Sequence, residues 1–351
     1  MEKVLMKGNE ALAEGAVIAG CRGFFGYPIT PSSEIAEYMA RKLPTIGGVF
    51  VQAESELAAI NMVYGGASTG TRVMTASSGP GLSLKQEGIS YIAEAELPCL
   101  IVNVSRGGPG LGGIQPAQSD YFQATRGGGH GDYHTMVLAP SGAQEMMDFA
   151  IKGFELADRY RIPVMIMAEG TLGNIMEPVI PREPVSDFFE KPWAITGCKD
   201  RAPNIINTLH LSAEFLEERN RHLFKKYARI IESEQRAETF LTDDADIIVV
   251  AFGIMARIAK KSVMEARKKG VKAGLFRPIS LWPFPDKKMQ EVARTAKRFL
   301  SVEISMGQMI QDIRLAVEGK APVELYGRIG ITPNPEEITR QLLLIAEREG
   351  Y

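Results

Sequence analysis

The stretch Tyr27-Pro-Ile-Thr-Pro-Ser-Ser-Glu34 follows a short apolar run and leads into a helical pattern. Its two prolines fix φ and remove two backbone donors, so Thr30 is held in a stiff, extended turn. Pro31 and the acidic residue three positions later suit the first turn of a helix. Residues 24–27 read as a strand, and ligands of open α/β sheets bind at the carboxyl ends of strands. The turn therefore predicts a rigid platform for the Thr30 hydroxyl; a stiff connection without a ligand is the competing interpretation.

Composition limits the class of protein. The chain has 351 residues, of which 45% are hydrophobic and 23% charged, as in an ordinary globular protein of two or three domains. A net charge of −2 gives no electrostatic case for binding nucleic acid or an anionic membrane. No apolar run approaches the roughly 18 residues of a transmembrane helix, and residues 1–10 lack the core of a signal peptide. We expect a cytoplasmic protein.

The cysteines and histidines do not form a metal-binding pattern. Cys21, Cys99 and Cys198 lie far apart, so they do not suggest a disulfide framework, and they are too few for the four thiolates of a typical iron–sulfur cluster. His130 and His134 are four residues apart, but the glycine between them places them in a loop. We expect no metal site in this chain.

Residues 8–168 alternate between helical and strand patterns. Apolar runs predict strands at 24–27, 48–52, 72–76, 99–104, 136–139 and 162–168, with helices at about 8–22, 32–43, 55–66, 81–96 and 141–158. Strands that alternate with helices indicate a parallel sheet covered on both faces.

The second half begins with a different composition. Residues 169–210 contain scattered prolines and predict an extended linker. Residues 211–238 place apolar side chains on one helical face, which predicts a long amphipathic helix packed on its own chain or on a partner. From residue 246 the alternation resumes, which indicates a second, smaller parallel-sheet domain. We therefore expect an α/β protein divided into residues 1–180, 181–242 and 243–351.

Two further features follow predicted strands. Glu56 begins a helix of small and apolar residues, where it either complements the helix dipole or lies buried and shares a proton with a ring nitrogen of a cofactor. The turn Ser78-Gly-Pro-Gly81 exposes backbone amides at a helix start, and Gly79 permits close backbone approach. Alone, that turn is a generic connection.

Arg106 follows the apolar strand 99–104 and begins the glycine-rich segment 107–131. A guanidinium at a strand end suits the carboxylate of a substrate, which it can bind with two hydrogen bonds. An ion pair within the chain, with Asp120 or Asp132, is the competing interpretation.

Together these motifs are more specific than any one alone. Tyr27-Pro-Ile-Thr-Pro-Ser32 resembles the signature of the α subunits of 2-oxoacid:ferredoxin oxidoreductases. Glu56, nine residues before Gly65, and the turn 78–81 resemble the pyrimidine-binding domain of thiamine diphosphate enzymes. Residues 277–285 and 303–308 resemble the transketolase C-terminal domain. The resemblance implies a pyrimidine-binding fold, a linker with a long amphipathic helix, and a transketolase C-terminal-like domain in the three ranges given above.

The resemblance also implies an activity. The family oxidatively decarboxylates a 2-oxoacid to acyl-CoA and CO2 and passes the electrons to ferredoxin. By position, Glu56 matches the catalytic glutamate that hydrogen-bonds the aminopyrimidine ring of the cofactor. Thr30 and Arg106 match the substrate contacts. The remaining matched cofactor-binding positions are Tyr27, Pro28, Ile29, Ser78 and Gly79.

The motifs that this chain lacks imply partner subunits. It has no Gly-Asp-Gly segment followed by Asn, so the diphosphate and Mg²⁺ half of the thiamine diphosphate site is expected on a β subunit. The iron–sulfur clusters are expected on γ and δ subunits, with ferredoxin, coenzyme A and the 2-oxoacid as further partners. We therefore expect that the chain does not turn over alone.

The sequence gives weaker evidence for the preferred substrate than for the family. Residues 107–118 and 127–133 look most like the branched-chain, or 2-oxoisovalerate, members of the family. A 2-oxoglutarate enzyme needs a second cation for the distal carboxylate, because an unpaired buried charge is costly; Arg126, His130 and His134 are the candidates. Two competing hypotheses are a non-catalytic assembly subunit and a ferredoxin-independent thiamine diphosphate decarboxylase.

Overall fold

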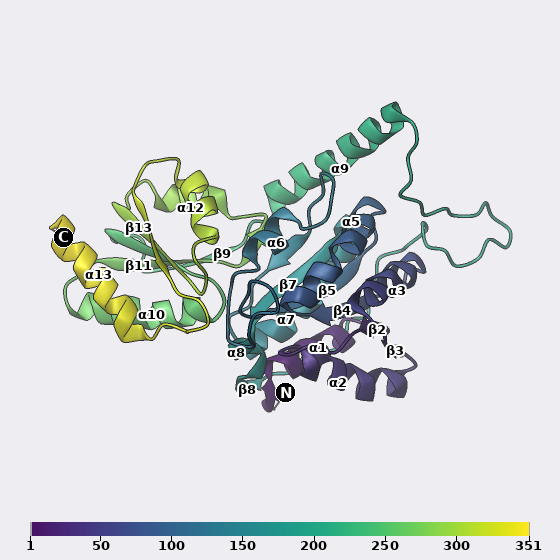
Figure 1. The fold of residues 1–351 in the computed structure, drawn as a ribbon, viewed down its shortest axis with the longest axis horizontal. Helices are drawn as coiled ribbons and strands as arrows, with labels where there is room; N and C mark the ends of the chain where they lie inside the picture. Colours follow the sequence, from purple (N-terminus) through teal and green to yellow (C-terminus); the bar gives the residue numbers. More distant parts are fainter. Residues whose placement is uncertain (1, 351) are drawn as a thin grey trace.

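The computed structural model describes residues 2–350, which form two sheets flanked by helices (Figure 1). The larger sheet has seven strands in the order β12-β6-β7-β5-β4-β2-β3. In chain order these are β2 (Gly23–Gly26), β3 (Val49–Gln52), β4 (Val73–Ser77), β5 (Cys99–Ser105), β6 (Met136–Leu138), β7 (Pro163–Glu169) and β12 (Ser280–Trp282). All pairings are parallel except that of β12, which lies antiparallel to β6.

Helices cover both faces of this sheet. One face carries α1 (Gly8–Ile18), α2 (Ser33–Lys42) and α7 (Ala143–Tyr160), and the other carries α3 (Glu56–Ser68) and α5 (Gln86–Glu94). Every residue of β5 and β7 is buried, as expected of parallel strands that are covered on both sides. The α/β alternation predicted for residues 8–168 is confirmed.

Short elements fill the connections. They are η1 (Leu43–Ile46), α4 (Gly79–Leu84), α6 (Tyr121–Arg126) and α8 (Gly170–Asn174), together with a ribbon in which β1 (Val4–Lys7) pairs antiparallel with β8 (Met176–Val179). Two sequence expectations are wrong here. The single helix expected over 81–96 is the pair α4 and α5, and the linker expected from residue 169 begins with ordered α8 and β8.

The smaller sheet has five strands in the order β14-β13-β10-β11-β9. These are β9 (Ala237–Phe240), β10 (Ile247–Val250), β11 (Ala273–Pro278), β13 (Arg298–Glu303) and β14 (Val323–Gly327). Helices α10 (Gly253–Lys268) and α13 (Pro335–Glu349) cover one face, and α11 (Asp286–Val292) and α12 (Met309–Val317) cover the other. The sheet is mixed rather than purely parallel, because β9 lies antiparallel to β11.

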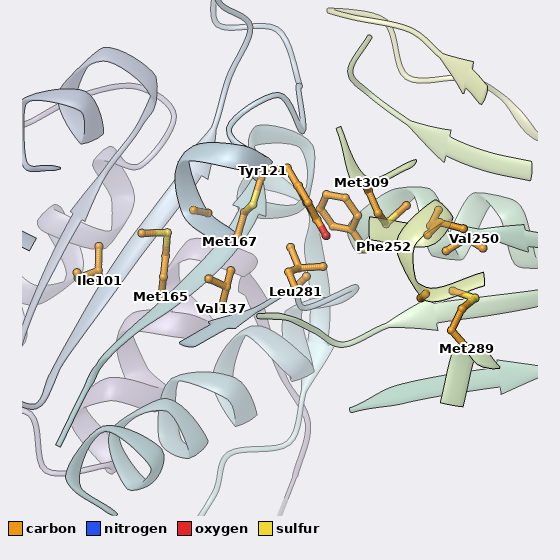
Figure 2. Close-up of a cluster of buried hydrophobic side chains, with 14 of the residues drawn as sticks. Ile101, Tyr121, Val137, Met165, Met167, Val250, Phe252, Leu281, Met289 and Met309 are labelled. Carbon is orange, nitrogen blue, oxygen red and sulfur yellow. The ribbon is translucent and has the colours of Figure 1, made fainter. Parts of the chain in front are cut away.

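One apolar cluster continues from the larger sheet into the smaller unit (Figure 2). Tyr121 and Phe252 meet with ring centroids 5.8 Å apart, between Met167 on β7 and Met309 on α12. A large apolar side chain that is fully buried stabilises the fold by about 1.5–3 kcal/mol. The two sheets are thus joined by a shared core.

Helix α9 (Ala213–Ser233) runs past the edge of the larger sheet, and the segment 180–212 that leads to it contains no helix or strand (Figure 1). Part of this segment packs on the larger unit, where the Val185 amide donates to the Ile18 carbonyl over 3.0 Å and the Ile195 amide donates to the Ser68 carbonyl over 2.9 Å. Leu223, Tyr227 and Ile230 are buried, so the apolar face packs on its own chain. The helix is shorter than the predicted 211–238, because residues 237–240 pair with β11 instead. No helix among residues 2–350 is both long enough and apolar enough to cross a membrane.

Candidate functional site

The proline turn lies at the carboxyl edge of the larger sheet, where β2 ends. Asn9, buried on α1, supports it from below: its side-chain amide donates to the Pro31 carbonyl over 2.9 Å. The Ser32 amide closes the turn by donating to the Ile29 carbonyl over 3.0 Å. The Thr30 residue is exposed, and its hydroxyl makes no hydrogen bond to the described part of the chain. The turn therefore presents a hydroxyl on a fixed support.

Arg106 joins the proline turn to the glycine-rich loop. Its guanidinium donates from Nη1 to the Thr30 carbonyl over 2.9 Å and from Nη2 to the Leu111 carbonyl over 3.1 Å. The residue is 8% exposed, and its Nε has no partner among residues 2–350. The interpretation as an ion pair with Asp120 or Asp132 is wrong: the guanidinium binds carbonyl oxygens. Asp120 lies near enough to interact with its charge.

The turn Ser78–Gly81 connects Arg106 with Glu56. Gly79 has a φ of +44°, and a Cβ built on it would lie 3.5 Å from Arg106 Cγ. A Cβ on Gly81 would lie 2.5 Å from both Glu56 Oε1 and Ser77 Oγ, closer than real Cβ atoms approach. The three motifs that follow β2, β4 and β5 therefore meet at one edge, together with Glu56 from α3.

Glu56 lies at the first position of α3, whose cap Ser55 accepts a hydrogen bond from the Ala58 amide over 3.2 Å. The Glu56 residue is 6% exposed, and its carboxylate makes no hydrogen bond within residues 2–350. Nearby, the buried hydroxyls of Ser77 and Ser78 also lack partners in that range. A buried carboxylate, two unpartnered hydroxyls and the space left by Gly81 fit a polar heteroaromatic ring such as an aminopyrimidine.

Sequence reasoning missed Lys85 at this edge, and it considered the half-buried Asp120 only as an ion-pair partner of Arg106. Lys85 is completely buried, and its Nζ donates to Thr75 Oγ1 over 2.9 Å. Asp120 accepts from the Asn103 side-chain amide over 3.1 Å, and burial raises the pKa of its carboxyl group despite the nearby Arg106 charge. A signal for Lys85 was present, since it stands four residues after Gly81 and so on the same helical face. Asp120 lay in a loop with no local pattern.

The carboxyl end of β7 is closed by the smaller unit. Glu169 is completely buried and accepts from the Ile254 amide, at the start of α10, over 2.6 Å. A Cβ on Gly253 would lie 2.7 Å from Glu169 Oε2, so only glycine fits there. Burial raises the pKa of Glu169 to about 7. The accessible edge is therefore the part formed by β2, β4 and β5.

The cations considered for a second carboxylate are engaged elsewhere. Arg126 forms an ion pair with Asp312 on α12 over 3.1 Å. His134 stacks on Trp282 with ring centroids 4.4 Å apart, and burial lowers the pKa of its imidazole. His130 meets the edge of the Tyr91 ring at 5.9 Å. By contrast, the loop beside Arg106 presents two aliphatic side chains, Leu111 and Ile114, which are 80% and 64% exposed.

Comparisons with known proteins agree with this arrangement. Residues 14–223 match the family model for the thiamine diphosphate-binding region of pyruvate flavodoxin/ferredoxin oxidoreductases, and residues 245–338 match core domain II of pyruvate:ferredoxin oxidoreductase. A ketoisovalerate oxidoreductase subunit of Methanothermobacter thermautotrophicus is 53% identical over 94% of both chains.

Two solved structures resemble the whole chain. The 2-oxoglutarate:ferredoxin oxidoreductase of Magnetococcus marinus superposes with a TM-score of 0.89 at 29% identity; the match covers 98% of this chain and 65% of that one. A split-gene transketolase superposes with a TM-score of 0.61 at 14% identity over 97% of both chains, which is a likeness of fold. By its family matches and its relatives, the chain belongs to the 2-oxoacid:ferredoxin oxidoreductases, as one subunit of such an enzyme.

Proposed function

We propose that this chain is the α-type subunit of an oxidoreductase that oxidatively decarboxylates branched-chain 2-oxoacids, above all 2-oxoisovalerate, to acyl-CoA and CO2. The substrate class is inferred from the side chains around Arg106. One guanidinium stands beside two exposed aliphatic side chains, Leu111 and Ile114, whereas Arg126 is tied to Asp312. This suits a substrate with one carboxylate and an apolar tail.

The site residues divide into substrate and cofactor contacts. Arg106 binds the carboxylate of the 2-oxoacid, since each terminal nitrogen has a second N–H besides the one that it donates to a carbonyl oxygen, and Thr30 offers its hydroxyl to the same substrate. Glu56 shares a proton with a ring nitrogen of thiamine diphosphate. The proline turn, through Tyr27, Pro28 and Ile29, lines the cofactor site.

Ser78 and Gly79 complete the cofactor contacts from the turn after β4. The residue at 81 must remain glycine, because a side chain there would fill the space next to Glu56. When bound, thiamine diphosphate supplies the carbon centre that accepts the electron pair released by decarboxylation. The contribution of this chain is to bind and orient the ring and to hold one proton.

The rest of the enzyme lies on other chains. We place the diphosphate and Mg²⁺ half-site on a β subunit, the iron–sulfur clusters on γ and δ subunits, and ferredoxin as the electron acceptor. Within this chain we propose a pyrimidine-binding unit over residues 1–180, a linker over 181–242 and a transketolase C-terminal-like unit over 243–351. The name of the ketoisovalerate oxidoreductase relative, at 53% identity, supports both the assembly and the substrate.

The test is a comparison of kcat/KM for 2-oxoisovalerate, 2-oxoglutarate and pyruvate with the purified complex, following acyl-CoA formation and ferredoxin reduction. We expect 2-oxoisovalerate to give the highest value. A higher value for 2-oxoglutarate would overturn the substrate assignment, and reduction of ferredoxin by the isolated chain would overturn the assignment as a subunit.

A pair of variants distinguishes a catalytic from a non-catalytic subunit. Glu56→Gln should lower kcat of the complex strongly, by about 100-fold or more, since general acid–base groups contribute on that order. Glu54→Gln is the matched control, because Glu54 is exposed two residues earlier. Full activity of the Glu56→Gln complex would favour a non-catalytic assembly subunit.

A further inference from the structure

Lys85 is a buried charge that the proposed function does not use. It is completely buried at the junction of α4 and α5, and its ammonium has one hydrogen-bond partner within residues 2–350, the Thr75 hydroxyl at 2.9 Å. Lysine is almost never fully buried unless it is paired with a counter-charge. The counter-charge of Lys85 is Glu56, and this pairing indicates the role of the lysine.

The local geometry directs Lys85 toward the region of Glu56. Lys85 stands four residues after Gly81, so both face the same side of the helical segment. Thr75 and Ser77 are two residues apart on β4 and therefore share one face of the sheet. A Cβ on Gly81 would lie 2.5 Å from both Glu56 Oε1 and Ser77 Oγ. These side chains form one buried polar cluster, which we call the Glu56 cluster.

The Glu56 cluster contains one cation and one carboxylate that act on each other. Among residues 2–350, Glu56 is the one charged group that acts appreciably on the Lys85 ammonium; burial lowers the pKa of Lys85 to about 8, and the Glu56 charge opposes that decrease. The influence is mutual, because a buried cation favours the ionised form of a neighbouring carboxylic acid.

We propose that Lys85, anchored on Thr75, is a positioning residue that keeps Glu56 ionised, so that the proton shared with the thiamine diphosphate ring resides on the ring nitrogen. The inference rests on the proposed cofactor site. One proton is involved: it is taken up from solvent when the cofactor binds to ionised Glu56, and it is already present when Glu56 is protonated beforehand. Lys85 itself does not touch the substrate.

The test measures proton uptake on cofactor binding, by titrating thiamine diphosphate into the assembled complex in a calorimeter with buffers of different ionisation enthalpy. The wild type should take up close to one proton per cofactor at about neutral pH. Lys85→Met, which keeps the length of the side chain but removes the charge, should take up clearly less. Lys225→Met, on the exposed face of α9, is the matched control and should behave as the wild type.

A double-mutant cycle isolates the effect on Glu56. In a Glu56→Gln background, Lys85→Met should cause no further change in proton uptake. The acid limb of the pH profile of kcat/KM should also move upward by about one pH unit in Lys85→Met, which corresponds to about a tenfold loss below that limb. If Lys85→Met does not fold, Lys85→Gln and Thr75→Val test the charge and the anchor separately.

The outcomes separate this inference from the proposed function. If the wild-type complex does not bind thiamine diphosphate, the proposed function fails. If it binds with proton uptake and Lys85→Met takes up the same number of protons, the proposed function stands and Lys85 is a packing residue only. An equal effect of Lys85→Met with and without Glu56 would likewise overturn the positioning role.

Discussion

Glu96 is the residue whose removal should most weaken the attachment of α9. It precedes β5, at the edge of the sheet opposite the candidate site, and its side chain is 10% exposed. Its carboxylate pairs with Lys226 at 3.0 Å, Arg219 at 2.7 Å and His222 at 3.1 Å, all on α9. Although burial raises the pKa of Glu96, the charges of Lys226 and Arg219 outweigh it and lower the pKa to about 2.

The magnitude follows from that pKa. A decrease from the ordinary 4.5 to about 2 corresponds to roughly 3 kcal/mol at about 1.4 kcal/mol per pKa unit. Removal of one partner from a buried ion pair costs about 3–5 kcal/mol. Lys226 and Arg219 keep other partners, the Arg161 carbonyl and Glu94. We therefore expect Glu96→Gln to destabilise the docked α9 by about 2–3 kcal/mol.

Hydrogen exchange of the α9 amides measures this loss directly, and about 2–3 kcal/mol corresponds to about 30- to 150-fold faster exchange. Because the pKa of Glu96 is depressed in the folded state, the contribution is complete above about pH 4.5 and is lost as the pH falls toward 2. The difference between wild type and Glu96→Gln should shrink over that range. Lys226→Met is the contrast: Arg219 still pairs with Glu96, so the effect should be smaller than that of Glu96→Gln. Equal exchange in wild type and Glu96→Gln would refute this reasoning.

Three further predictions concern the site and the interface between the sheets. Gly81→Ala should abolish measurable thiamine diphosphate binding by the complex, since its Cβ would lie 2.5 Å from a carboxylate oxygen and a serine hydroxyl; Gly65→Ala, which meets nothing within 4 Å, should bind normally. Leu111→Arg should raise kcat/KM for 2-oxoglutarate relative to 2-oxoisovalerate by about tenfold or more, because one hydrogen bond to a charged group contributes about 1.5–3 kcal/mol. Leu315→Arg is the control: Leu315 is also exposed, and its substitution should leave that ratio unchanged. Glu169 has a pKa raised to about 7, so its contribution to stability is complete below about pH 4.5 and is lost as the pH rises through about 7. Glu169→Gln should therefore be more stable than wild type by about 3 kcal/mol at about pH 8 and equally stable at about pH 4. Denaturation curves that show the same difference between variant and wild type at both pH values would contradict this.

The elements of the larger sheet were predictable because their signals are local. Each buried parallel strand is a short apolar run bounded by turn residues, and its helix follows in sequence. The missed strands, β1, β8, β9 and β12, have three or four residues each and depend on partners far away in the chain. β12, for example, pairs with β6 across more than a hundred residues, and no spacing within residues 280–282 encodes that pairing.

The candidate site likewise has parts that could be predicted from local sequence and parts that could not. The proline turn, Glu56 and Arg106 each follow a predicted strand, so their common edge could be inferred from parallel topology alone. The partner of Arg106 could not, because the Leu111 carbonyl is a backbone group whose position depends on the conformation of the glycine-rich loop. Lys85 was missed for another reason: its burial results from packing against Thr75, whereas lysine in a sequence usually indicates a surface.

The antiparallel strand β12 has a consequence for any attempt to divide this protein. It is contributed by the second half of the chain, yet it covers the outer edge of β6 in the first half. A fragment that ended in the segment 180–212 would leave the backbone groups of β6 open to pairing with other molecules, which favours aggregation. The two halves would have to find each other in solution to restore that pairing, at a cost in association entropy that the continuous chain avoids. The connection between the halves therefore acts as a tether for sheet completion, and a gene split at the linker would yield two mutually dependent pieces.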